Sequence, residues 1–129
     1  MNDEMLTIQQ VAEATSLTEH TLRYYERIGL IHPIPRADNG HRRYTRDDVG
    51  WIDFLNKLRA TGMSIQQMQQ YAELQRDGDL TLPQRVELLK AHRCQVEAHM
   101  AELSEYLKVI EYKIGIYEQL VAETLPELS

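Results

Sequence analysis

Residues 8–23 of the chain read IQQVAEATSLTEHTLR, and this spacing is typical of two short helices joined by a tight turn. Ala12 is small where the two helices would approach each other, and Ser16 falls at the turn. Leu17 and Leu22 are spaced to point back into a core. The stretch therefore predicts a helix-turn-helix.

Capping residues mark the starts of four helices in the first part of the chain. Thr7 with Gln10 has the capping-box spacing, in which a hydroxyl and an amide side chain satisfy free backbone N–H groups. Gly29 and Gly62 are expected to end the second and third helices. The predicted N-cap residues are Thr7, Thr18, Thr45 and Ser64, and the inward stripes of the third and fourth helices would be Val49, Ile52, Leu55, Leu58, Ile65, Met68 and Tyr71.

Between residues 29 and 45 the pattern changes. Pro33 and Pro35 exclude a helix and confine any strand to an edge. Asn39-Gly40 is typical of a two-residue type I′ turn, which needs positive φ at both positions. We therefore expect a small β-hairpin wing, with short strands at residues 31–36 and 41–44.

The net charge of −6 hides a basic region. Between residues 20 and 46 the acidic side chains are Glu26 and Asp38, and they are outnumbered by arginines. Phosphates respond to a local basic face rather than to the total charge, and arginine suits bidentate contacts with phosphate and guanine. The arginines of this stretch are Arg23, Arg27, Arg36, Arg42, Arg43 and Arg46.

The last part of the chain carries an apolar seam with the 4-3 alternation of a coiled coil. Arg93 interrupts it. A helix from residue 82 to 121 would be ~60 Å long, whereas a compact fold of the whole chain would have a radius of gyration of only ~14 Å. The apolar seam positions are Leu82, Val86, Leu89, Val96, Met100, Leu103, Leu107, Ile110, Ile114, Tyr117 and Val121.

The seam therefore needs a partner helix, most simply the same helix of a second copy. The alternative is a bundle within one chain, but the preceding residues are too few to cover the seam. Arg93 disfavours a register that sets it against its own mate, and this favours antiparallel pairing. The predicted fold is all-α with a small β-hairpin wing, namely a winged helix-turn-helix followed by a long antiparallel coiled-coil dimerisation helix.

The expected domain boundaries follow from these breaks. A winged helix-turn-helix domain would take residues 1–76, with a second helix pair at 45–76. The remaining segments would be a linker at 77–80, the dimerisation helix at 81–121 and a short tail at 122–129.

The sequence argues against an enzyme and against a membrane protein. No nucleophile–base grouping or Gly-rich phosphate loop is present, and no cofactor is expected. No apolar run is long enough to span a bilayer. Cys94 is the single cysteine, which excludes an intrachain disulfide and fits a reducing cytoplasm. His92, Cys94 and His99 do not share one helix face, so no metal site is expected.

Three segments resemble signature segments of the MerR family of transcription regulators. They read TLRYYERIGL at residues 21–30, RADNGHRRY at 36–44 and LRATGMSI at 58–65, in the family's order and separation. The resemblance runs from Leu6 to about Leu120. It is nearest to small members without a separate effector domain, in the branch that responds to aldehyde, thiol or oxidative stress.

The resemblance implies DNA contacts from the second helix and the wing. Arg23 and Tyr24 would contact base edges and backbone, and Tyr25 would straddle core and backbone; the alternative is that both tyrosines are core residues. Glu26 is expected to pair with Arg23 or Arg27. Wing arginines and a tyrosine hydroxyl would contact phosphates. The predicted DNA-binding residues are Thr18, His20, Thr21, Arg23, Tyr24, Tyr25, Arg36, Asn39, Gly40, His41, Arg42, Arg43 and Tyr44.

The family's mechanism implies a homodimer on a pseudo-palindromic site in double-stranded promoter DNA. On a signal the dimer would bend and untwist that DNA, so that RNA polymerase engages both promoter elements. The alternative function is a coiled-coil interaction module without specific DNA binding.

The signal is less well defined. Members of this branch often carry a cysteine near the position of Lys57, and its absence here argues against cysteine-based aldehyde sensing. Cys94 is the candidate redox residue, because Arg93 and His92 would favour its thiolate. The alternative is an inert free thiol.

Overall fold

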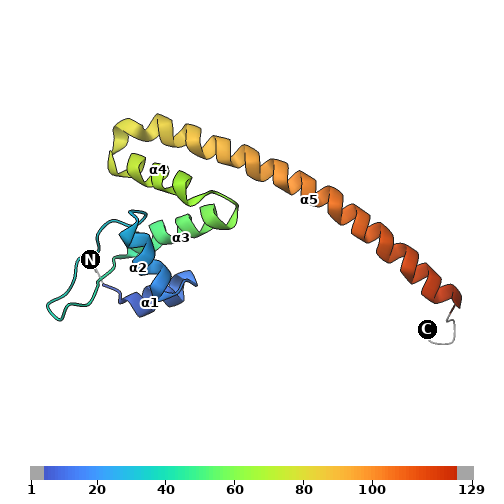
Figure 1. The fold of residues 1–129 in the computed structure, drawn as a ribbon, viewed down its shortest axis with the longest axis horizontal. Coiled ribbons are helices and arrows are strands. Elements are labelled where there is room, and N and C mark those ends of the chain that lie inside the picture. The colour runs from blue at the N-terminus through green and yellow to red at the C-terminus, as the bar shows by residue number, and fades with distance from the viewer. Residues whose placement is uncertain (1–4, 125–129) are drawn as a thin grey trace. The chain divides into compact units, whose positions relative to one another are not determined.

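A computed structural model describes residues 5–124 of the chain. It divides into two compact units, residues 1–89 and 90–129, which we describe separately (Figure 1). We call the described part of the first unit, residues 5–89, the head, and that of the second, residues 90–124, the tail helix. The elements are α1 (Ile8–Thr15), α2 (Glu19–Arg27), α3 (Arg46–Ala60), α4 (Ile65–Arg76), the 3-10 turn η1 (Asp79–Thr81) and α5 (Leu82–Thr124).

The predicted N-caps are confirmed. Each side chain accepts a hydrogen bond from the backbone N–H three residues later, at 3.0–3.2 Å. This matters for the site because Thr18 fixes where α2 begins, and Gly29, with φ of 86°, lies just beyond its end. The confirmed N-caps are Thr7, Thr18, Thr45 and Ser64.

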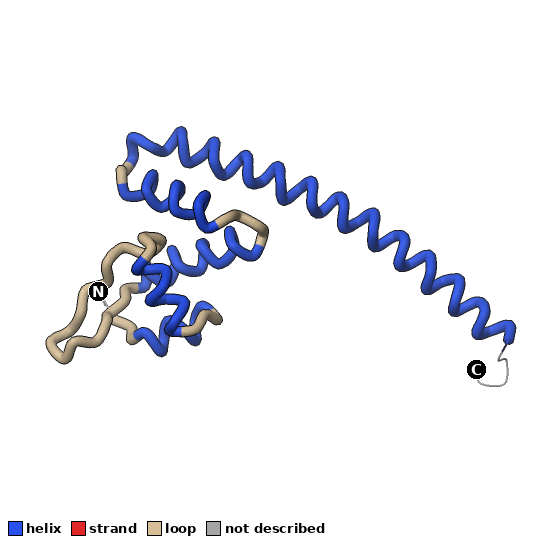
Figure 2. The backbone as a smooth tube through the Cα atoms, in the orientation of Figure 1, coloured by secondary structure: helices blue, strands red, loops and turns tan. Residues whose placement is uncertain are grey.

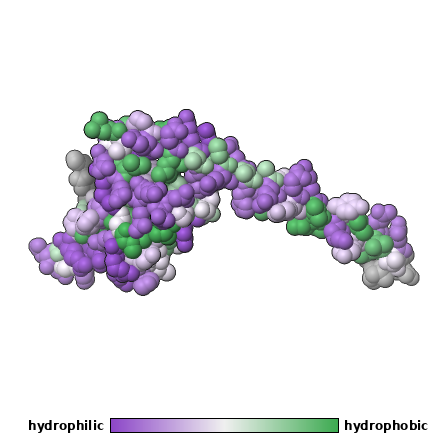
Figure 3. Space-filling view, turned by 45° about the horizontal axis from the view of Figure 1, so that its top comes forward, coloured by the Kyte–Doolittle hydropathy of each residue, from purple (hydrophilic) through white to green (hydrophobic). Residues whose placement is uncertain are grey.

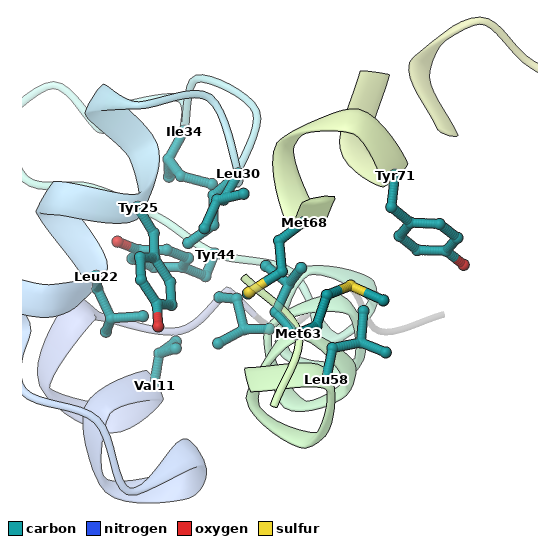
Figure 4. Packing of buried hydrophobic residues seen from close by; sticks show 13 residues of the cluster. Val11, Leu22, Tyr25, Leu30, Ile34, Tyr44, Leu58, Met63, Met68 and Tyr71 are labelled. Carbon is teal, nitrogen blue, oxygen red and sulfur yellow. The ribbon is translucent and has the colours of Figure 1, made fainter. Parts of the chain in front are cut away.

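One hydrophobic core holds the head together (Figure 4). Val11 of α1, Leu22 of α2 and Ile52 of α3 are all fully buried, and burial of a side chain of this size contributes about 1.5–3 kcal/mol. The expected inward stripes of α3 and α4 lie in or against this core, as does Leu17. The helix-turn-helix is therefore fixed by the helices that follow it.

The expected strands at residues 31–36 and 41–44 are absent from the described residues (Figure 2). Residues 31–44, which we call the wing segment, instead form isolated antiparallel bridges, Arg36 with Arg42 and Leu6 with Tyr44. Two hydrogen bonds pair the arms, from Ala37 N to His41 O at 2.8 Å and from Arg43 N to Pro35 O at 2.9 Å. The ladder is short because prolines have no N–H to donate. The β-hairpin wing is therefore not confirmed.

The turn at the tip also differs from the expected type I′ turn at Asn39-Gly40. Gly40 has φ of 83°, whereas Ser16 is the one non-glycine residue with positive φ in the described chain, so Asn39 does not have it. A hydrogen bond from Gly40 N to Ala37 O closes the turn at 2.9 Å. The Asn39 side chain accepts a hydrogen bond from His41 N at 3.0 Å. This local bond favours a three-residue loop ending in glycine over a two-residue turn.

The tail helix leaves its apolar side chains exposed. Within α5, which is 43 residues and so ~64 Å long, the seam residues from Met100 onward are 50–63% exposed. Figure 3 shows apolar groups among polar ones on this helix. Among the described helices, none is both long and apolar enough to cross a membrane. The exposed seam residues of the tail helix are Met100, Leu103, Leu107, Ile110, Ile114, Tyr117 and Val121.

Candidate nucleic-acid interface

The second helix of the helix-turn-helix, α2, presents a polar face to solvent. Leu22 and Tyr25 hold the opposite face in the core. His20 and Arg23 are exposed, and Tyr24 is half-buried. The arrangement leaves these side chains accessible to a DNA groove, as a recognition helix requires.

Two predicted contact residues at the start of α2 bond to each other. The Thr18 hydroxyl accepts from Thr21 N at 3.0 Å and donates to the Thr21 hydroxyl at 2.9 Å. The Thr18 hydroxyl therefore caps the helix, and the Thr21 hydroxyl accepts its proton. Thr21 retains acceptor capacity, because a hydroxyl oxygen has two lone pairs.

Tyr24 is organised by its neighbours. The Arg27 guanidinium lies over its ring at 5.3 Å from the centroid, a cation–π contact. Its ring is also 6.1 Å from that of Tyr25, tilted by 47°. This contact places an arginine and a tyrosine together on the exposed face of α2.

A cleft of about 400 Å³ lies between α1, α2 and the wing segment. We call it the arginine cleft. It brings together predicted residues from distant parts of the sequence, because the wing segment folds back beside α2. Its lining residues are Thr7, Ile8, Gln9, Glu19, Arg23, Arg36, Gly40, His41, Arg42 and Arg43.

Sequence reasoning missed Glu19 and residues 7–9 as part of this cleft. The signal for the latter was present, because Thr7 caps α1 and the N-terminus of a helix offers free N–H groups to a phosphate. Glu19 was unremarkable in sequence, since acidic residues are common in the first turn of a helix.

Glu26 has a different partner from the expected Arg23 or Arg27. Its Oε1 accepts from Arg42 Nε at 2.7 Å, and its Oε2 accepts from Ile34 N at 3.2 Å. The Glu26 and Arg42 side chains are each less than a fifth exposed. One carboxylate on α2 therefore holds both arms of the wing segment, and Arg23 pairs instead with Glu19 at 3.6 Å.

Two predicted DNA-contacting tyrosines lie in the core. Tyr44 is fully buried and Tyr25 is 6% exposed. Figure 4 shows both rings near Leu22. Within the described residues the Tyr44 hydroxyl has no hydrogen-bond partner, and burial raises the pKa of Tyr44 above its ordinary value of 10.0. The buried Tyr44 hydroxyl cannot reach a phosphate in this structure, which corrects the expectation for Tyr44. Tyr25 packs in the core as expected, and its backbone contact with DNA stays a prediction.

The remaining wing residues stay accessible. Arg36, Asn39 and His41 are exposed, and Arg43 is half-buried. Arg36 Nη1 donates to Gly40 O at 2.9 Å, which braces the tip. The positive charge expected on the wing is therefore on its surface.

His32 ties the wing segment to α3. Its Nε2 lies 2.6 Å from Asp48 Oδ1, and its Nδ1 lies 3.0 Å from Pro33 O. Both neighbours are acceptors, so the protonated ring satisfies both. The hydrogen bond to Asp48 raises the pKa of His32 above its ordinary value of 6.5. Asp48 also accepts from Thr45 N at 2.9 Å, as the capping box of α3 requires.

The candidate redox residue lies on the tail helix. Cys94 is exposed on α5, so its redox role stays a prediction. Among residues 5–124, no three His, Cys, Asp or Glu side chains gather closely enough to hold a metal ion.

Two family sequence patterns match overlapping stretches of the chain. The pattern described as MerR HTH family regulatory protein matches residues 6–75. The pattern described as MerR, DNA binding matches residues 49–111.

Two relatives share much of the chain. An uncharacterized HTH-type transcriptional regulator of Haemophilus influenzae is 34% identical over 116 residues, which are 90% of this chain and 86% of that protein. The HTH-type transcriptional regulator AdhR of Bacillus subtilis is 43% identical over 88 residues, which are 68% of this chain and 63% of AdhR.

Solved structures agree with the sequence matches. HiNmlR, a MerR family regulator lacking the sensor domain and bound to promoter DNA, is 33% identical with a TM-score of 0.84, over 95% of this chain and 96% of that one. A putative MerR family transcriptional regulator from Listeria monocytogenes is 36% identical with a TM-score of 0.86, over 95% of this chain and 93% of that one.

Proposed function

The chain belongs to the MerR family of DNA-binding transcription regulators, and from that premise we propose that two copies of it bind one pseudo-palindromic promoter site. Each head would occupy one half-site. The observation that carries this proposal is the contrast between an arginine cleft in the head and an uncovered apolar seam in the tail helix.

The head would contact DNA through two sets of residues. The exposed face of α2 supplies groups that reach base edges, and the arginine cleft supplies cations that reach phosphates. Arg42 contributes through the guanidinium nitrogens that Glu26 leaves free. We assign base-edge contacts to His20, Thr21, Arg23 and Tyr24, and phosphate contacts to Arg36, Asn39, Gly40, His41, Arg42 and Arg43.

The tail helix would pair with its copy from a second chain. Seam residues that are half-exposed in one chain would be buried by a matching seam, and apolar burial is the main driving force for association. Arg93 favours the antiparallel arrangement, because that arrangement avoids setting Arg93 directly against Arg93 of the second chain. We therefore keep residues 81–121 as the dimerisation helix, after a DNA-binding domain at 1–76 and a linker at 77–80, with residues 31–44 acting as the wing.

The dimer would act by deforming promoter DNA. Contacts from two heads offset the cost of bending, which for a site of this size is of order 1–6 kcal/mol. RNA polymerase would then engage the reshaped promoter in the cytoplasm, in response to a stress signal.

Three measurements test the proposal. Sedimentation equilibrium should give twice the mass of the 15.1 kDa chain. A salt-titrated shift assay with promoter fragments should show affinity that falls steeply as salt rises, because each phosphate contact releases counterions. A footprint should be two-fold symmetric. A monomer that protects an asymmetric site would contradict the proposal.

The alternative of a coiled-coil module without specific DNA binding is not favoured. The family match includes the DNA-binding segment, and the structure of HiNmlR at 33% identity contains promoter DNA.

A further inference from the structure

We propose that Glu19 is a specificity-determining residue of the DNA interface, whose carboxylate accepts a hydrogen bond from the amino group of one cytosine in each half-site. This inference rests on the DNA-binding function described above. It adds to that function a base contact from an acidic side chain.

Glu19 occupies the position from which a recognition helix reads bases. It is the first residue of α2, directly after the N-cap Thr18. Helices of this kind place their N-terminal residues against base edges in the major groove. Its side chain also lines the arginine cleft beside Arg23.

A carboxylate at this place suits the first turn of the free helix, but it opposes DNA binding unless it has a partner in the complex. Four arginines suited to phosphates line the same cleft, and an acid among them repels the same phosphates. Its presence therefore weakens sequence-independent binding. A hydrogen bond to one particular base would offset that loss at the correct site alone.

The carboxylate of Glu19 has acceptor capacity to spare. Its side chain is 38% exposed, and its ion pair is with Arg23 at 3.6 Å, longer than a hydrogen bond. Among the described residues it accepts no side-chain hydrogen bond. An ionised carboxylate only accepts, and the cytosine N4 amino group is the donor that glutamate recognises in the major groove.

Glu26 shows what an acid with a purely internal role looks like on the same helix. Both of its oxygens are used, one by Arg42 at 2.7 Å and one by Ile34 N at 3.2 Å. Its side chain is 18% exposed, half as much as that of Glu19. The two acids therefore have different tasks, although both lie among the arginines of the DNA-binding face.

The test is selection of preferred half-sites from a randomised duplex by the full-length chain. We compare the wild type with Glu19→Ala, Glu19→Gln, Arg23→Ala and Glu13→Gln. Glu13 is an exposed acid on α1 outside the cleft, so Glu13→Gln controls for net charge. Thermal unfolding of each variant controls for folding.

Glu19→Ala should lose the preference for cytosine at one symmetric position by about tenfold, the lower part of the range for a lost base contact. Glu19→Gln should shift that position toward adenine, which glutamine recognises. Binding of both variants to random DNA should strengthen or hold, and Glu13→Gln should keep the wild-type preferences.

Three results would overturn the proposal. A uniform change in affinity without a change in preference would leave Glu19 with only an electrostatic or helix-capping role. Loss of the same position in Glu19→Ala and Arg23→Ala would mean that Glu19 acts through Arg23. Loss of a preference for a base other than cytosine would exclude the assigned contact. Failure of the wild type to select any sequence would instead count against the DNA-binding function itself.

Discussion

The head and the tail helix treat their apolar side chains in opposite ways. In the head, Val11, Leu22 and Ile52 are fully buried by neighbours from the same chain. In the tail helix, Leu107 and Ile110 are more than half exposed. The head can therefore reach a stable fold alone, whereas the tail helix gains its stability from whatever covers its seam. Under the proposed function, this contrast assigns DNA recognition to the head and assembly to the tail helix.

The largest effect should come from placing charges in the seam. Leu107→Asp with Ile114→Asp would bury carboxylates in the proposed dimer interface, so the chain should become monomeric. Affinity for a two-fold symmetric site should fall by about 100-fold or more, because the second head is no longer tethered. Sedimentation equilibrium and a shift assay measure the two effects.

Val109→Asp is the matched control, since Val109 is 66% exposed on the same helix but lies off the seam. It should remain dimeric. Equal disruption by this variant would mean that the heptad does not define the interface.

Truncating one residue in each region should sharpen the contrast. Ile52→Ala removes a buried side chain from the head and should cost about 2–5 kcal/mol at any protein concentration. Leu107→Ala should lower the Tm more as the protein is diluted, because its contribution depends on association. Thermal unfolding over a range of concentrations distinguishes the two. A loss for Leu107→Ala that ignores concentration would place its partner within the same chain.

Within the head, Glu26→Gln should weaken DNA binding although it removes a negative charge from the DNA-binding face. The carboxylate holds Arg42 and Ile34, and a lost charged hydrogen bond costs about 1.5–3 kcal/mol. If about half of this cost appears in binding, affinity falls about three- to twelvefold. Asp38→Asn, an exposed acid at the wing tip, should not weaken binding. Stronger binding by Glu26→Gln would show that Glu26 affects DNA affinity mainly through its charge and not through the position of the wing segment.

Tyr44→Phe should leave DNA affinity unchanged, because the ring is buried. Stability should hold or rise by about 1 kcal/mol, since the variant removes a buried hydroxyl that has no hydrogen bond among the described residues. Arg43→Ala, beside it, should weaken binding. A loss of affinity in Tyr44→Phe with unchanged stability would restore the phosphate contact that the sequence suggested.

The smallest effect concerns pH. The pKa of His32 is raised in the folded state by Asp48, so the pair stabilises the head fully below pH 6.5 and loses this contribution as the pH rises through the raised value. The Tm difference between the wild type and His32→Gln should therefore shrink from about pH 6 to about pH 9. A constant difference would mean that the ring acts by packing alone.

Most of the head could be predicted because its signals are local. Each predicted N-cap, from Thr7 to Ser64, bonds to a backbone N–H three residues away, and so depends only on nearby sequence. The wing could not be predicted as well. Asn39-Gly40 suits several turns, and the choice among them depends on how the arms are held.

The partner of Glu26 shows the same limit. Arg23 and Arg27 are near it along the chain, and Arg42 is sixteen residues away. Their short distance along the sequence favoured Arg23 and Arg27 as predicted partners of Glu26. Folding of the wing segment against α2 brings Arg42 within 2.7 Å instead.

The sequence by itself determined the helix starts, the helix-turn-helix and the unpartnered heptad seam, because these follow from capping and periodicity within short stretches. Only the tertiary structure decided that Tyr44 is buried, that Glu26 holds the wing segment and that Glu19 lies among the arginines of the cleft. These facts depend on contacts between residues far apart in the chain, which no local pattern encodes.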